Sequence, residues 1–96
     1  MDLLEQVEDW YSSQCNGDWE HQHGISIDTL DNPGWSVTID LKGTNLSGVV
    51  MSPHHRHASD SDWVSCEVRD AKFIGNGGSR NLGTILELFT KLLLSV

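Results

Sequence analysis

The two cysteines are the residues of this chain best suited to nucleophilic chemistry, but their surroundings argue against it. An enzyme that carries sulfur on a cysteine needs a thiolate held by backbone N–H groups, usually with an arginine nearby to lower the thiol pKa. Cys15 is instead followed by Asp18 and Glu20, an acidic setting that we expect to disfavour a thiolate, and Cys66 falls within an alternating apolar run. We therefore interpret both cysteines as free thiols that pack against other apolar side chains.

The histidines fall into two groups that could bind a metal ion. The groups are His21 with His23, and His54 with His55 and His57. Structural zinc takes three or four ligands at fixed geometry, and the sequence has no H-E-x-x-H or paired C-x-x-C pattern. The glycine-rich segment near the C-terminus also lacks the Lys-Ser/Thr pair of a nucleotide-binding loop. We expect neither a metal site nor a cofactor.

Charge narrows the class of partner. The chain has 96 residues, a length that fits one domain (1–96), and its 14 acidic and six basic residues give a formal net charge of −8. This field repels nucleic acid and anionic membranes and favours a cationic partner, such as a basic protein, although an acidic surface can also serve only solubility. The acidic N-terminus lacks the positive start of a signal peptide, and no apolar stretch approaches ~18 residues. We expect a cytoplasmic protein.

Helical and alternating periods predict the elements of the first half. Apolar residues at helical spacing predict a helix over residues 2–15, and Asn16-Gly17 supplies a stop. From residue 19 to 29 the period is two, which predicts a strand with Trp19, His21 and His23 on one face. A second alternating run begins at Trp35. Pro33 and Gly34 fit the central positions of a type II turn, so the two runs predict an antiparallel hairpin.

The second half predicts further strands and a closing helix. Residues 46–51 indicate a third strand, 52–62 a mobile loop, 63–68 a fourth strand and 72–74 a short fifth strand, with a turn at Asp70-Ala71. Residues 75–78 are interpreted as a flexible entry to a helix capped by Ser79 or Asn81. The apolar stripe of that helix is Leu82, Ile85, Leu86, Phe89, Leu92 and Leu93. The order predicts an α+β fold: an antiparallel sheet of four or five strands with both helices packed on one face.

Two motifs carry a family resemblance. The strings GDWEH (Gly17–His21) and DNPGW (Asp31–Trp35) follow Trp10-Tyr11 and precede a C-terminal set of matches. That set is Phe73, Gly75, Gly77-Gly78, Asn81-Leu82 and Ile85-Leu86. Over nearly the whole chain this pattern resembles immunity protein family 53 of bacterial polymorphic toxin systems, some members of which carry a rhodanese-related sulfurtransferase label. The resemblance implies an α+β fold and a protein that binds a toxin made by the same cell, without a catalytic group.

The sequence thus predicts an immunity protein, not an enzyme, that neutralises a cognate and basic toxin by stoichiometric binding. The candidate contact residues are Asp18, Trp19, Glu20, His21, Asp31, Asn32 and Trp35. Core packing is the competing interpretation for the two tryptophans, and a structural turn is the competing interpretation for Asn32. The alternative function is a small-ligand-binding or sensor module that uses the face of the first hairpin strand, with Trp19, His21 and His23.

Overall fold

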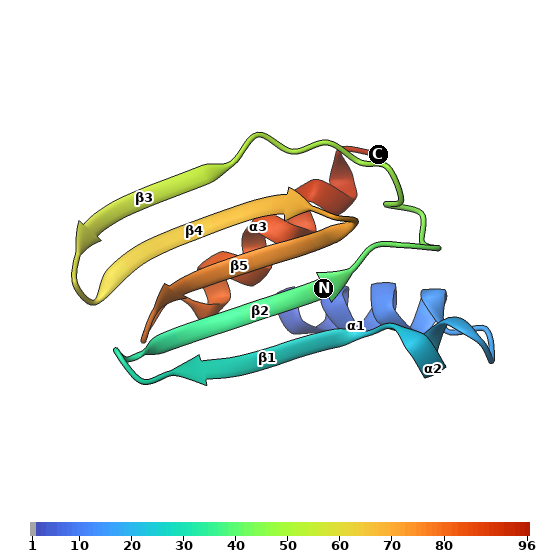
Figure 1. The fold of residues 1–96 in the computed structure, drawn as a ribbon, viewed down its shortest axis with the longest axis horizontal. Coiled ribbons are helices and arrows are strands. Elements are labelled where there is room, and N and C mark those ends of the chain that lie inside the picture. The colour runs from blue at the N-terminus through green and yellow to red at the C-terminus, as the bar shows by residue number, and fades with distance from the viewer. Residues whose placement is uncertain (1) are drawn as a thin grey trace.

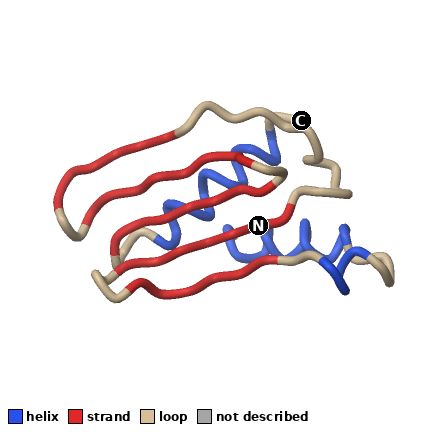
Figure 2. The backbone as a smooth tube through the Cα atoms, in the orientation of Figure 1, coloured by secondary structure: helices blue, strands red, loops and turns tan. Residues whose placement is uncertain are grey.

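Two helices cover one face of a five-stranded antiparallel sheet in the computed structural model, which describes residues 2–96 (Figures 1 and 2). The elements are α1 (Leu3–Gln14), α2 (Trp19–Gln22), β1 (Ile25–Leu30), β2 (Gly34–Asp40), β3 (His54–Ser59), β4 (Asp62–Arg69), β5 (Lys72–Gly78) and α3 (Leu82–Leu94). The strand order is β1-β2-β5-β4-β3, so β1 and β3 form the two edges. The predicted α+β fold, with an N-terminal and a C-terminal helix, is confirmed.

The two long helices form where the apolar period predicts them. At the start of α1 the carboxylate of Asp2 accepts a hydrogen bond from the backbone N–H of Glu5 at 2.8 Å, which satisfies one of the free N–H groups of the first turn. Val7 and Trp10 are buried on the inner face of α1. In α3 the buried residues follow the predicted stripe, and they include Ile85 and Phe89.

A chain of aromatic rings joins the helices to the sheet. Trp19, Trp10, Phe89 and Phe73 contact one another edge to face in that order, with ring centroids 6.1, 5.1 and 5.4 Å apart. Such pairs stabilise a core by about 0.5–1.5 kcal/mol each beyond the area that they bury. The helix α3 lies close to β5 because Gly75 has no side chain: a Cβ there would stand 2.5 Å from Cγ2 of Ile85. The prediction that residues 75–78 form a flexible segment is therefore wrong, because these residues form the end of β5.

The prediction that the first strand begins at residue 19 is also wrong, because residues 19–24 are not part of it. Trp19–Gln22 form the short helix α2, and β1 begins only at Ile25. Local hydrogen bonds explain the difference: Oδ1 of Asn16 accepts from the backbone N–H groups of Asp18 and Trp19, both at 2.9 Å. Such bonds between a side chain and the backbone compete with a strand, although the apolar period there is two.

The hairpin of β1 and β2 is present, but its turn differs from the predicted one. Gly34 is the first residue of β2, and it is not among the glycines with positive φ, as a type II turn would require. The peptide bond between Asn32 and Pro33 is cis. Gly34 is needed for close packing instead, because a Cβ there would collide with the carbonyl oxygen of Gly77 in β5.

The segment between β2 and β4 departs most from expectation. Residues 46–51 form turns and irregular backbone in place of the third strand, and the side chain of Leu46 fills the core. Residues 54–59, predicted as part of a mobile loop, form β3, which pairs with β4 from His54↔Cys66 to Ser59↔Asp62. Every residue of β3 is exposed, so the strand is held by backbone pairing and leaves no apolar period in the sequence.

Candidate partner interface

The charges of the molecule are segregated along the chain. Residues 1–41 hold nine of the 14 acidic residues and none of the six basic residues. The described part of this segment forms α1, α2, β1 and β2, which lie together at one side of the fold, with α1 behind the two strands and α2 at their end (Figure 1). We refer to α1, α2 and β1 as the acidic side. The positions of the charges can be read in the sequence, but net charge alone does not reveal their separation along the chain.

The acidic side contains an apolar hollow between α1 and β1. The hollow has a volume of about 350 Å³ and is lined by Val7, Glu8, Tyr11, Gly24, Ile25 and Ile27. Tyr11 is 36% exposed and Ile27 is 44% exposed, and Leu4 is exposed one helical turn before Glu8. Large apolar side chains are thus accessible beside carboxylates, as in interfaces that combine an apolar centre with a polar rim.

The hollow lies where the helices leave the edge strand β1 partly uncovered. Ile25 and Ile27 pair with Ile39 and Val37 of β2, so their side chains point toward the helix-covered face. Ile39 and Val37 are fully buried under the helices, whereas Ile27 on the edge strand is not. The apolar stripe of the sheet therefore continues onto β1 beyond the helix that would cover it.

The sequence-predicted contact residues fall into two groups at opposite ends of β1. Asp18, Trp19, Glu20 and His21 lie in and around α2, before the strand, and Asp31, Asn32 and Trp35 lie at the turn beyond it or just after that turn. The six residues of β1 span about 20 Å. The structure does not bring the two groups together, and the hollow of the acidic side lies between them.

In the first group, the side chains of two residues have structural partners. Trp19 is only 5% exposed, and its indole N–H donates to the carbonyl of Lys42 at 2.9 Å, so it packs in the core. The carboxylate of Glu20 accepts from the backbone N–H groups of Asn16 at 2.9 Å and Gly17 at 2.7 Å. Its own backbone N–H, followed by that of Asn16, lowers the pKa of Glu20. Glu20 therefore holds the turn between α1 and α2, while Asp18 and His21 are exposed.

The second group is arranged in a similar way. Asp31 and Asn32 are exposed in the turn between β1 and β2. Trp35 is half-buried, and its indole N–H donates to the carbonyl of Ser79 at 3.0 Å. Trp35 thus ties the start of β2 to the segment that precedes α3.

The proposed ligand pocket of the alternative function is not assembled as expected. Trp19, His21 and His23 do not share a strand face, because α2 occupies that segment. A hollow of about 200 Å³ is lined partly by Trp19 and His23 but not by His21. Typical small-molecule pockets have volumes of about 300–1,000 Å³. Nδ1 of His23 lies 3.7 Å from a carboxylate oxygen of Asp40, which also accepts from the N–H of Gly24.

Of the two thiols, Cys66 is a packing group of the core, whereas Cys15 lies outside the core cluster. Cys66 is fully buried in β4, and burial raises the pKa of its thiol to about 11, so the thiol is protonated at neutral pH. The half-buried Cys15 is also free, and its Sγ lies 3.3 Å from the carbonyl oxygen of Tyr11.

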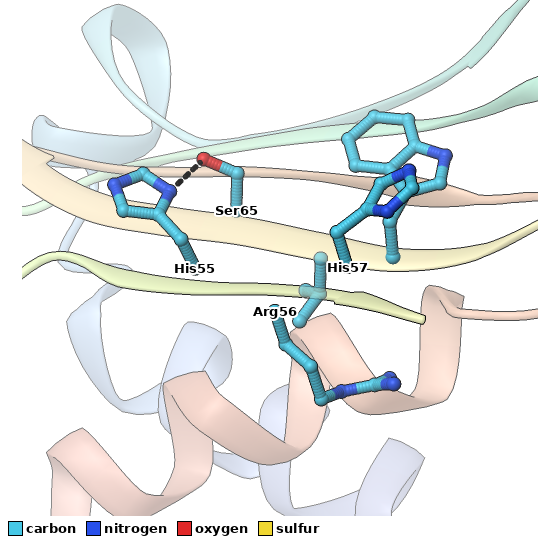
Figure 3. A pocket seen from close by; sticks show the side chains of 6 residues that line it. His55, Arg56, His57 and Ser65 are labelled. Atoms are coloured by element: carbon cyan, nitrogen blue, oxygen red, sulfur yellow. Dashed lines mark hydrogen bonds between the residues drawn. The ribbon is translucent and has the colours of Figure 1, made fainter. Parts of the chain in front are cut away.

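The histidines of β3 are divided between the two faces of the sheet. His55 and His57 pair with Ser65 and Trp63 on the face without helices, and Arg56 points the opposite way (Figure 3). Nδ1 of His55 lies 2.8 Å from the hydroxyl of Ser65. Within residues 2–96, no group of three or more His, Cys, Asp or Glu side chains is arranged to hold a metal ion.

Comparisons with known proteins give a family. None of the helices in residues 2–96 combines the length and the apolar character needed to cross a membrane. Neither the curated proteins nor the solved structures include a match to this chain. A family model described as Immunity protein 53 matches residues 4–93, from the first turn of α1 to the last turn of α3. The chain therefore belongs to the Immunity protein 53 family.

Proposed function

We propose that this protein neutralises a cognate bacterial toxin by stoichiometric binding, and that the acidic side is the contact surface. The observation that carries the proposal is the apolar hollow between α1 and β1, set in the part of the chain that holds nine acidic and no basic residues. Membership of the family supports an immunity function and a toxin partner in general. The charge of the acidic side adds that this toxin presents a basic surface.

The physical roles of the two kinds of residue differ. Tyr11 and Ile27 offer apolar area that is already ordered in the free protein, and tyrosine is enriched among residues that dominate binding energy. Carboxylates such as Glu8 and Asp18 act over a longer range, because they steer a cationic partner during diffusion. Steering raises the association rate, and apolar burial lowers the dissociation rate. Neither role needs a catalytic group, a metal ion or a cofactor.

The contact residues predicted from the sequence contribute to the proposed interface to different degrees. Asp18 and His21 are exposed near the end of α1 and remain candidate contacts, as do Asp31 and Asn32 at the far turn. Glu20 contributes charge, but its carboxylate is already bonded to the turn that it holds. We assign no direct contact to Trp19, because its side chain packs in the core.

Co-expression with the toxin encoded beside this gene tests the proposal. The wild-type protein is expected to restore growth of a bacterial host that produces the toxin. The purified proteins are expected to form a one-to-one complex, with an association rate that falls about tenfold between 50 mM and 500 mM salt, because the Debye length shortens across that range. Failure to restore growth, or an association rate independent of salt, would contradict it.

A further inference from the structure

We infer that β1 accepts an extended basic segment of the toxin as a sixth strand of the sheet, with apolar side chains of that segment seated in the hollow beside α1. The inference rests on the proposed function and specifies how the partner is held. It combines three features of the acidic side: the free edge of β1, the apolar hollow and the carboxylates beside them.

The backbone of β1 has the orientation that strand addition needs. The carbonyl of Gly24 accepts from the N–H of Asp40 at 3.0 Å, which makes this pair a hydrogen-bonded one in the β1–β2 register. In an antiparallel ladder such pairs alternate with pairs that exchange no hydrogen bonds. The N–H and C=O groups of Ile25, Ile27 and Thr29 therefore point away from β2, toward the open edge. An added strand can pair with these groups without breaking any bond to β2.

The side chains along this edge suit the same mode of binding. Ile25, Ile27 and Thr29 face the side of the sheet on which α1 lies. Every second side chain of an added strand would point to that side too, next to Ile27 and over the hollow lined by Tyr11. Leu4, which is 60% exposed, extends the apolar area along α1. The pattern fits a segment with apolar residues at alternate positions.

The carboxylates beside β1 favour a basic segment as the strand that pairs with it. Glu8 lines the hollow on the helix side of β1, and Asp28 is exposed on the opposite face of the strand. A segment with lysine or arginine between its apolar residues would place cations near both carboxylates. A second copy of this chain would instead bring its own acidic side against them, and like charges placed together across an interface are strongly unfavourable. The edge thus favours a basic partner over self-association.

Substitution at Thr29 tests the backbone contact with the toxin domain encoded beside this gene as the probe. Thr29→Pro removes an outward N–H, a position at which an edge strand tolerates proline. Thr29→Ala removes the same exposed side chain but keeps the N–H, and it is the matched control. By titration of the purified proteins, the proline variant is expected to bind at least about tenfold more weakly than the alanine variant.

Hydrogen exchange on the wild-type complex gives an independent measurement if the proline variant does not fold. The amides of Ile25, Ile27 and Thr29 are expected to exchange at least about tenfold more slowly in the complex, whereas the amides of β3 keep their rates. Equal affinities of two folded variants, or unchanged exchange at these three amides, would overturn strand addition and leave the proposed function standing. A wild-type protein that does not bind the toxin would overturn both.

Discussion

The two edges of the sheet differ in composition and in regularity. At one edge, β1 pairs with β2 over six consecutive residues, contains Ile25 and Ile27, and has no basic residue or proline. At the other edge, β3 is exposed throughout, includes three histidines and an arginine, and has a register shift between His57 and Ser59. Irregular, charged edges are a common protection against unwanted pairing. The comparison indicates that β3 is protected from pairing, while β1 is left available.

The difference extends to the charges around each edge. The guanidinium of Arg56 in β3 pairs with Asp62 at 2.9 Å, and Glu67 lies 3.4 Å from Arg69 in the neighbouring strand. Charges near β3 are thus largely balanced within the protein. Among residues 2–96, neither Glu8 nor Asp28 near β1 forms an ion pair. Unbalanced charge acts at longer range than paired charge, so a cationic partner is attracted toward the β1 edge.

Reversing charge at one edge at a time is expected to separate the roles of the two edges most clearly. Glu8→Lys with Asp28→Lys changes the net charge from −8 to −4 and places cations beside the hollow. The affinity for the toxin is expected to fall about 100-fold, because repulsion slows association and unpaired cations face a basic partner in the complex. Surface plasmon resonance would resolve the two rates.

The matched control makes the same change in net charge at the other edge. Asp60→Lys with Glu67→Lys also changes the net charge from −8 to −4, in the turn before β4 and in β4 itself. The affinity is expected to stay within about threefold of wild type, since these positions lie outside the proposed contact and act only through the weaker, screened field. Equal losses from both pairs would show that overall charge, and not the acidic side, governs binding.

Loss of the Asn81 side chain, which anchors the β3–β4 hairpin, should lower the stability of the protein without changing its affinity for the toxin. Asn81 is buried; its side chain accepts from the N–H of Trp63 at 3.3 Å and donates to the carboxylate of Asp62 at 3.0 Å. Asn81→Ala leaves the Trp63 N–H without this acceptor, so the free energy of unfolding should fall by about 1–3 kcal/mol in chemical denaturation. Toxin affinity should stay within about twofold at a temperature where the variant is folded.

The pH dependence of this loss of stability tests the role of Asp62. Arg56, followed by Asn81, lowers the pKa of Asp62 in the folded protein. A lowered pKa stabilises the fold above the pKa of the unfolded state, about 3.9 for aspartate, and this contribution is lost as the pH falls through the folded pKa. The difference in stability between wild type and Asn81→Ala should therefore shrink below about pH 4. A difference that grows in acid would contradict the assigned role of Asp62.

The spacing of apolar residues and the presence of turn-forming residues predicted the elements that bury an apolar face. Both long helices and β4 follow from apolar spacing, and the turn at Asp70-Ala71 is present, with positive φ at both residues. The sequence did not reveal α2, because bonds from the side chains of Asn16 and Glu20 to the backbone decide that segment. It did not reveal β3 either, since an exposed edge strand has no apolar period to read.

The candidate interface was predictable only in its charge. Net charge indicated a cationic partner, but Trp19 was a candidate contact through its residue type alone, and the competing interpretation, core packing, is the correct one. The hollow beside Ile27 results from the register of β1 on β2 and from the incomplete cover of β1 by the helices. Both are tertiary properties, and neither leaves a local pattern in the chain. The clustering of acidic residues before residue 42 was the one signal that could have located this side.

The histidines of β3 should contribute least to both stability and binding. His54→Ser, His55→Ser and His57→Ser together replace three exposed side chains and keep the backbone pairing with β4. The contact between His55 and the Ser65 hydroxyl is exposed, where water competes for both groups, so its net contribution is small. The midpoint of thermal unfolding is expected to shift by no more than about 2 °C, and toxin affinity by no more than about twofold. Addition of a chelator to the wild-type protein should leave the midpoint unchanged. A triple variant that loses more affinity than Glu8→Lys with Asp28→Lys would contradict the proposed contact at β1, because it would place the contact surface at the β3 edge.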